Sequence, residues 1–388
     1  MGIGKKFAPE VVREQDPDTG AWVSRLTGYR ANCNHLYFTN NSFYDHNTKM
    51  VVCGDRDNAS NFFSIDLKTF EITQLTELPV LPYPQEYVML EGIVDPVRNY
   101  CYFFAGTELK RLDLMNYELI TIYTIPEGYR KHIVSCGRDS EYIYTSIYED
   151  VTANFQTDTQ HGYIGFDKIA EAKPLSKILK VRYDGSSAEC IREEKCWIAH
   201  VNVSPTNPDW ITYCHEGPWH TVDHRIWGMD TRTGEVWKIH ETKPGEVVGH
   251  EYWYQDGVHI GYHGTKADGS KVMGRICFDN TDNQETVFPY NTGHIYSRDV
   301  SLIVGDGNAE GKYVRVWKWN GTGYDAPRAL CQHFSSFKDQ NTHVHPAISP
   351  DGRNVIFTSD RTGYNQVYWA EIPEDVDSLP LLEKYSKL

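Results

Sequence analysis

The feature that most constrains the fold of this chain is a sequence unit that recurs along its length. The clearest copy runs from His343 to Asp360, where a short alternating segment leads through a Ser-Pro-Asp-Gly turn into a second strand, Val355–Thr358. A polar turn and a third strand, Gln366–Ile372, follow. Runs with a period of two residues, separated by turn residues, are typical of hairpins, and three in a row predict a β-meander.

Seven copies of this unit can be aligned on their first residues, which lie 44 to 68 residues apart and mostly near 50. The copies begin at or near His35, Glu86, His132, His200, His250, His294 and His343. A period of about 40 to 50 residues with four short strands per unit is the signature of a β-propeller. We therefore expect an all-β chain, a single seven-bladed β-propeller domain over residues 1–388 with four-stranded antiparallel blades.

Two segments depart from the repeat. Arg13–Thr27, which contains Trp22–Thr27, precedes the first copy, and we expect this segment to be the outer strand that closes the ring on the last blade. Closure removes the sheet edges that would otherwise favour aggregation. The polar segment Asp150–Lys173 widens the gap between two copies and is interpreted as a loop insertion.

Net charge, cysteine distribution and the lack of long apolar runs limit the partners and the cellular location that we expect for this chain. The formal charge of −15 argues against nucleic-acid and anionic-membrane partners, because both require clustered Lys and Arg. Nine scattered Cys without a Cys-x-x-Cys pair favour reduced thiols over a disulfide framework. No apolar run approaches the ~18 residues of a membrane span, and no signal peptide is visible. We expect a soluble, cytoplasmic protein whose oligomeric state stays open.

Histidine opens six of the seven units. The first strand of each propeller blade lines the central channel, so these side chains are expected to converge at its mouth. A single His in a β protein is usually a hydrogen-bonded structural residue. Repetition at equivalent positions favours a shared site instead.

The strongest local pattern is Gln340-x-x-His343-x-His345-Pro346. Residues two apart on an extended strand share a face, so both imidazoles can reach one ion, with the Gln340 oxygen as a further ligand. His294, one unit earlier, is the natural fourth ligand. This mixed nitrogen and oxygen set fits a divalent first-row metal better than Ca²⁺. The alternative is that His343 and His345 are structural residues flanking a strand.

A second group of polar residues lies within Cys214–Arg225 and Gly249–Trp253. His215 and Glu216 invite comparison with the zinc-protease pattern His-Glu-x-x-His, but the next histidine, His220, comes one residue too late, and Gly-Pro breaks any helix there. A Gly-x-Ser-x-Gly elbow and a phosphate-binding P-loop are both absent from the sequence. Serine hydrolase and nucleotide chemistry therefore lack support.

Together these blocks resemble oligogalacturonate lyase, the pectin-degrading propeller enzyme of polysaccharide lyase family 22. The resemblance covers nearly the whole chain and is carried by Gln15–Gly20, Arg25–Thr27, Cys214–Pro218, Val222–Arg225, His250–Trp253, His294, Ser297, Gly305–Gly307, Gln340–Pro346 and Phe357–Asp360. Three positions depart from the expected pattern, namely His224, Tyr252 and the region around His35.

The resemblance implies β-elimination on short, acidic oligogalacturonides, giving 4,5-unsaturated uronate products. The family's manganese ligands fall on His294, Gln340, His343 and His345, although another divalent first-row metal is also compatible. Its catalytic histidine falls on His250 and its essential arginine on Arg225. We rank His200, His215 and His220 lower, as substrate contacts or structural residues.

Two other classes of function remain. A non-catalytic, TolB-like interaction platform explains the repeats equally well, but not the gathering of His, Arg and Gln in the later units. A hydrolytic glycosidase with two carboxylates is the other alternative. The sequence does not determine the preferred substrate length or the physiological metal.

Overall fold

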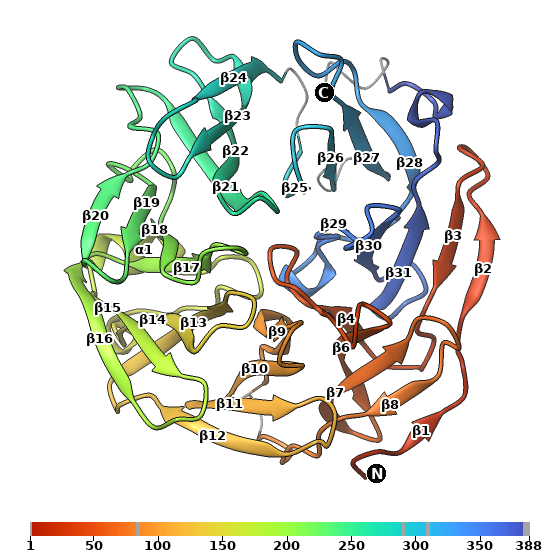
Figure 1. Cartoon of the computed structure of the whole chain (residues 1–388), viewed down its shortest axis with the longest axis horizontal. Helices are drawn as coiled ribbons and strands as arrows, with labels where there is room; N and C mark the ends of the chain where they lie inside the picture. Colours follow the sequence, from red (N-terminus) through yellow and green to blue (C-terminus); the bar gives the residue numbers. More distant parts are fainter. Residues whose placement is uncertain (1, 83–85, 289–291, 308–310, 383–388) are drawn as a thin grey trace. The chain divides into compact units, whose positions relative to one another are not determined.

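The computed structural model describes residues 2–82, 86–288, 292–307 and 311–382, and these form seven antiparallel sheets (Figure 1). Contacts divide the chain into two compact units, one comprising residues 1–90 and 286–388 and the other residues 91–285. The boundaries follow the blades, with one sheet per sequence copy, except that the strand Gln284–Val287 extends past residue 285.

The unit of residues 91–285 holds four sheets of four strands, each in simple sequential order. They are β9 (Ile93–Asp95), β10 (Tyr100–Ala105), β11 (Glu108–Asp113) and β12 (Leu119–Thr124); β13 (Tyr129–Cys136), β14 (Tyr142–Glu149), β15 (Leu175–Arg182) and β16 (Ala188–Lys195); β17 (Ile198–Val203), β18 (Trp210–His215), β19 (Ile226–Asp230) and β20 (Glu235–Lys238); and β21 (Val247–Trp253), β22 (His259–Thr265), β23 (Lys271–Cys277) and β24 (Gln284–Val287).

The other unit holds three sheets. The first has the order β1 (Lys6–Phe7), β8 (Ile72–Gln74), β7 (Ala59–Asp66), β6 (Lys49–Arg56) and β4 (Cys33–His35), with β5 (Phe43–Tyr44) also pairing β6; the second runs β25 (Ile295–Ser297), β26 (Leu302–Gly305), β27 (Tyr313–Lys318) and β28 (Arg328–Gln332); the third has the order β2 (Val12–Gln15), β3 (Trp22–Arg25), β31 (Gln366–Glu371), β30 (Asn354–Ser359) and β29 (Ala347–Ile348).

Helices are short in the described part of the chain. They are the α-helix α1 (Phe166–Ala172) and the 3-10 turns η1 (Met89–Glu91), η2 (Thr152–Asn154), η3 (Gln340–Thr342) and η4 (Val376–Ser378). None of these is long and apolar enough to cross a lipid bilayer. The predicted all-β class and the number of blades are confirmed.

The N-terminal segment joins the last sheet as predicted, but as two strands rather than one. Strand β3 pairs antiparallel with β31, aligning Val23 with Ala370, and β2 folds back as the outermost strand. The hairpin turn forms because the Asp16 carboxylate accepts the backbone N–H groups of Asp18 and Thr19, both at 3.0 Å, and because Gly20 adopts a φ of +75°. This blade therefore has five strands.

The predicted loop insertion lies between β14 and β15 and contains a helix. Helix α1 buries Ile169 against Tyr148 and Trp197. Its Ala170 lies so close to Gly217 that a Cβ on that glycine would be 2.8 Å from the alanine Cβ. The insertion is thus packed against the loop that follows β18.

The core of each unit consists of apolar side chains from adjacent sheets. Between β9–β12 and β13–β16, for example, Tyr102, Ile143 and Val181 are buried in one cluster. Leu26, just beyond β3, is fully buried in a cluster that also contains Phe63 and Ile356. Its backbone N–H donates to the carbonyl of Val367 at 2.8 Å.

Replacing Leu26 by Ala is expected to lower the free energy of unfolding by about 2–5 kcal/mol, because a fully buried leucine leaves a cavity. Val12→Ala is the control, since Val12 is 48% exposed on the outermost strand and its change is expected to stay within about 0.5 kcal/mol. Denaturant titration of both variants measures this difference. Equal stabilities of the two variants would contradict the packing role of the N-terminal segment.

Candidate active site

Bulges displace the repeated histidines in the innermost strands of residues 91–285. The strand register shifts between Lys131 and Val134, between Ala199 and Asn202, and between Gly249 and Tyr252. Within the last two bulges, His200 and His250 have φ values of +45° and +50°. Positive φ is uncommon for residues other than glycine, and bulges near functional sites redirect side chains. These histidines therefore lie inside bulged strands rather than at strand starts.

Arg225 is held between two buried carboxylates. Its Nη1 donates to Glu216 Oε1 at 2.8 Å and its Nε donates to Glu251 Oε2 at 3.3 Å. His200 Nε2 lies 3.2 Å from the other Glu216 oxygen. Burial alone would raise the pKa of the Glu216 carboxyl, but Arg225 and His200 hold this pKa well below its usual range. Glu216 is therefore ionised, and it fixes the position of the Arg225 guanidinium.

His250 lies against a second histidine that the sequence analysis missed. His250 Nδ1 and His263 Nε2 are 2.7 Å apart, and the two rings stack with centroids 5.0 Å apart. The Trp219 ring meets His250 edge-on at 5.1 Å and lies 5.5 Å from the guanidinium carbon of Arg225. Trp219 thus connects the two predicted catalytic residues within one unit.

Gly249 makes this arrangement possible. A Cβ at Gly249 would lie 2.4 Å from Trp219 Cζ2, which is closer than two carbon atoms can approach. Gly249 is also directly opposite His263 in the pairing of β21 with β22. This cross-strand register was the signal from which the role of His263 could have been found.

Of the three lower-ranked histidines, His200 contacts the Arg225 cluster with its ring, through Glu216, whereas His215 contacts it through its backbone N–H, which donates to the Arg225 carbonyl at 3.0 Å. The His200 ring lies 5.0 Å from that of His132, whose pKa burial lowers to about 3. His215 Nε2 instead lies 2.9 Å from Glu194 Oε2. His220 is exposed in the loop after Trp219.

Three histidines of the other unit form a cluster. His294, His343 and His345 each offer one ligand nitrogen, and these atoms lie within 4.8 Å of one another. The ring centroids of His294 and His345 are 4.2 Å apart, and those of His343 and His345 are 5.5 Å apart. These three residues, which the sequence analysis grouped as candidate ligands, therefore lie close together.

The predicted reason for this proximity is wrong, however. His343 and His345 do not share the face of a strand, because β29 begins only at Ala347 and His345 has a φ of +45°. His343 instead follows η3, the turn that Gln340 opens. The left-handed backbone at His345, just before Pro346, turns its ring toward His294. Gln340, three residues before His343 in the sequence, is half-buried.

A buried carboxylate orients His294. Asp306 is fully buried, and its Oδ2 lies 2.7 Å from His294 Nδ1. Its Oδ1 accepts the backbone N–H groups of Gly293 at 3.0 Å and His294 at 3.1 Å. An ionised Asp306 therefore keeps the proton on Nδ1 and leaves Nε2 as the ligand atom, as in many metal-binding histidines. The Gly305-Asp-Gly307 motif was noted in the sequence, but its partner was not.

His35 supports the same cluster from β4. Its Nε2 lies 2.8 Å from the carbonyl oxygen of His345, and its Nδ1 lies 2.7 Å from Thr358 Oγ1. Burial lowers the pKa of His35 to about 4, so the ring is neutral near pH 7 and Nε2–H donates to the carbonyl. Phe38 stacks on the His345 ring with centroids 5.7 Å apart. His35 thus positions the backbone that carries a candidate ligand.

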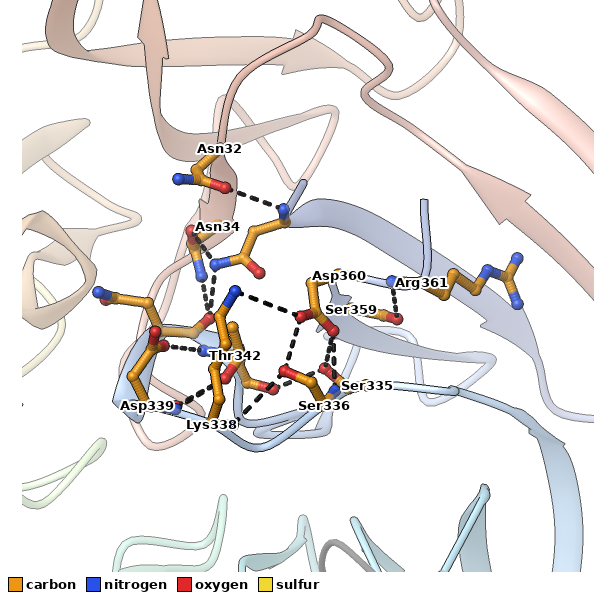
Figure 2. A network of polar contacts seen from close by, with 12 residues as sticks. Asn32, Asn34, Ser335, Ser336, Lys338, Asp339, Thr342, Ser359, Asp360 and Arg361 are labelled. Atoms are coloured by element: carbon orange, nitrogen blue, oxygen red, sulfur yellow. Dashed lines mark hydrogen bonds and ion pairs between the residues drawn. The ribbon is translucent and has the colours of Figure 1, made fainter. Parts of the chain in front are cut away.

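A polar network anchors the segment that carries Gln340 and His343 (Figure 2). The Asp339 carboxylate accepts the N–H of Thr342 at 3.0 Å, and the Thr342 hydroxyl completes a capping box around η3. Asn34 donates to the carbonyl of Asn341 at 2.6 Å. Asp360 accepts the backbone N–H of Ser336 at 2.8 Å. The segment is therefore tied to both β4 and the end of β30.

The three imidazoles suit a divalent cation. Burial and the neighbouring His294 lower the pKa of His343 to about 4, so this ring is neutral and able to act as a ligand. Within the part of the chain that the structure describes, His343 Nδ1 is buried without a hydrogen-bond partner. Imidazole nitrogens are ligands that suit a first-row divalent metal.

The seven sheets and this histidine cluster define the chain as a β-propeller with a candidate metal centre. The family model described as oligogalacturonate lyase matches residues 1–376, and the chain belongs to the oligogalacturonate lyase family. It is 27% identical to an oligogalacturonide lyase of Pectobacterium atrosepticum and 27% identical to an oligogalacturonate lyase of Dickeya dadantii, over 97% of this chain and 100% of each relative.

Solved structures agree with this assignment. An oligogalacturonate lyase in complex with manganese is similar with a TM-score of 0.86 and 26% identity, over 97% of this chain and 100% of that one. An oligogalacturonate lyase from Vibrio parahaemolyticus gives a TM-score of 0.85 and 26% identity, over 96% and 99% of the two chains. The chain is therefore a lyase, and a non-catalytic interaction platform is not favoured.

Replacing Glu216 by Gln is expected to lower the free energy of unfolding by about 3 kcal/mol near pH 7, because one partner of a buried ion pair is lost. The pKa of Glu216 is depressed in the folded state, so its ionised form stabilises the fold above the unfolded pKa of about 4.3. This stabilisation is lost as the pH falls through the folded pKa. The difference between wild type and variant should therefore shrink in acid, as measured by denaturant titration across pH.

Asp223→Asn is the matched control, because the Asp223 side chain is 76% exposed only two residues from Arg225. Its effect is expected to stay within about 0.5 kcal/mol. A Glu216→Gln effect that did not change with pH would contradict the ionised, buried pair.

Proposed function

We propose that this chain cleaves short oligogalacturonides by β-elimination at C5 of a uronate. The C5 proton is removed, the C4–O bond breaks, a C4=C5 double bond forms, and the departing oxygen takes up a proton from water. The observation that carries the proposal is the convergence of His294, His343 and His345, whose ligand atoms lie within 4.8 Å of one another.

Manganese is the metal we propose, because one similar solved structure is an oligogalacturonate lyase in complex with manganese. His294, His343 and His345 would hold it, with Gln340 as a further ligand. When bound, the cation supplies positive charge that neutralises the uronate carboxylate and stabilises the enolate-like transition state. Asp306 and His35 keep two of these ligands in place.

His250 is the proposed base. Imidazole is the side chain best suited to accept a proton near neutral pH. Because His263 lies against Nδ1 of His250 at 2.7 Å, the proton from C5 would be accepted at Nε2. The left-handed backbone and the Trp219 ring fix the direction of this imidazole.

Arg225 is proposed to bind substrate anions rather than to donate a proton. Its pKa lies well above its usual value: burial alone would lower it, but the neighbouring Cys214, Glu216 and Glu251 favour the charged form. A permanent cation can pair with a uronate carboxylate or with the developing charge on the C4 oxygen. His200 is the further substrate contact that the geometry favours, since it shares Glu216 with Arg225. His215 and His220 have weaker support.

Two further predictions concern the chain as a whole. We propose that residues 1–388 form one propeller domain, and the family model supports this because its match extends over both compact units. We also propose a cytoplasmic location, which the free state of all nine cysteines supports. Nucleic acids and membranes are not expected as partners, given the formal charge of −15.

The reaction is tested with digalacturonate in an ultraviolet absorbance assay, because a lyase produces a conjugated uronate whereas a hydrolase does not. His250→Ala is expected to lower kcat by about 10²–10⁴-fold with metal content unchanged. His343→Ala is expected to lose both metal and activity. Chelation should abolish wild-type activity, and added Mn²⁺ should restore it.

His46→Asn is the control for these variants, because His46 is exposed and asparagine tolerates its φ of +57°. Near-normal turnover in His250→Ala would contradict the proposal that His250 is the base. Activity that is indifferent to chelation would remove the metal from the mechanism.

His263 is predicted to be a positioning residue for the base. His263→Ala should lower kcat about 10–100-fold with KM little changed, because His250 loses the partner of its Nδ1. The pH profile of kcat should also shift, which a purely structural defect would not cause. His263→Gln retains a hydrogen-bonding group and should recover part of kcat. Equal activities for the Ala and Gln variants would count against this role.

A further inference from the structure

A second group of metal-ligating side chains lies in the sheet β21–β24. His259, Cys277 and Asp282 each offer one ligand atom, and these atoms lie within 4.8 Å of one another. His259 at the start of β22 is directly opposite Cys277 at the end of β23. The backbone N–H of Cys277 donates to the carbonyl of Thr281 at 2.9 Å, and this turn brings Asp282 back toward the strand pair.

The His259 ring is oriented as a metal ligand would be. Asp256 Oδ2 lies 2.6 Å from His259 Nδ1, while Asp256 Oδ1 accepts the backbone N–H groups of Val258 at 2.9 Å and His259 at 3.0 Å. This carboxylate keeps the proton on Nδ1. The deprotonated Nε2 then lies 3.7 Å from Asp282 Oδ2. A carboxylate behind a histidine is the usual support of a zinc-binding imidazole.

The spacing also fits a tetrahedral ion. Ligand atoms about 2.0–2.3 Å from zinc at tetrahedral angles are about 3.3–3.8 Å apart, which includes the distance from His259 Nε2 to Asp282 Oδ2. Asp282 is held in place by Arg275 at 3.1 Å and by Gln284 at 2.8 Å. The side chains of His259 and Asp282 are 19% and 46% exposed, so an ion can enter from solvent.

A second cluster in this unit, formed by Glu194, Cys196 and His215, also combines a carboxylate, a thiol and an imidazole. We call it the self-contained network, because its carboxylate accepts hydrogen bonds from protein donors. Around Glu194, Cys196 and His215, the carboxylate accepts hydrogen bonds from Arg192 at 2.5 Å and Tyr213 at 3.1 Å, and Cys196 donates to it as well. The Glu194 oxygens are therefore occupied by protein donors. The Asp282 oxygens also accept hydrogen bonds, from Arg275 and Gln284, so the two clusters differ at the thiol. Cys196 donates to its carboxylate, whereas the Cys277 thiol makes no hydrogen bond within the described residues.

We propose that His259 Nε2, the Cys277 thiolate and an Asp282 oxygen bind a zinc ion, with the fourth position left to water. The thiolate is a soft ligand that favours zinc over manganese, so this site differs in preference from the three-histidine cluster. Binding displaces the thiol proton to solvent. The ion would connect β22, β23 and the turn that leads to β24, and would therefore stabilise this sheet.

The test uses Co²⁺ as a probe with the full chain, because a cobalt–thiolate bond gives a near-ultraviolet charge-transfer band that imidazole and carboxylate ligands do not give. Wild type is expected to develop this band and to lose it when Zn²⁺ is added. Cys277→Ser and His259→Gln are expected to lack the band. Asp256→Asn keeps an oxygen for the backbone N–H groups and is expected to bind zinc about 10–100-fold more weakly.

Two controls separate this site from the others. Cys196→Ser should retain the band, because its thiol belongs to the self-contained network. His343→Ala should also retain it, so a failure of the proposed manganese centre leaves the result unaffected. A wild-type chain without the band, or a band that persists in Cys277→Ser, overturns the proposal.

Discussion

The pairing of β3 with β31 is the contact on which the unit containing the histidine cluster depends. It places the beginning of the chain beside the last sheet, and β4 follows only a few residues later. His35 at the end of β4 thereby reaches the carbonyl of His345, more than 300 residues further along. A long-range strand pairing of this kind gives the candidate ligands a rigid support that no local segment could provide.

Buried carboxylates organise both groups of candidate functional side chains. Asp306 holds one imidazole through a single strong contact, and Glu216 holds a guanidinium and an imidazole at once. A desolvated carboxylate is stable only with such partners, so each pair constrains both of its members. Orientation is therefore established before any substrate arrives, which is what electrostatic catalysis requires.

Much of the fold, and part of the candidate site, could be predicted from the sequence. The number of units, the strand Val355–Thr358 and the three-histidine grouping follow from turn residues, period-two runs and repeat alignment. The contacts of His263 with His250, of Asp306 with His294 and of His35 with His345 were not predicted. Each depends on cross-strand register or on contacts between neighbouring sheets. The geometry of His343 and His345 was also mistaken, since a strand was assumed where the chain makes a turn and a left-handed residue. Periodicity identifies strands but does not locate their irregularities.

The left-handed backbone at His250 has an evolutionary consequence. Besides glycine, only asparagine, aspartate and histidine enter that conformation with some ease, whereas β-branched residues are strongly disfavoured. Of this short set, histidine alone combines a comfortable fit with proton exchange near neutrality. Under the proposed role of His250 as the base, homologues with asparagine or aspartate at this position should keep the architecture while losing turnover, and they would be recognisable from that residue.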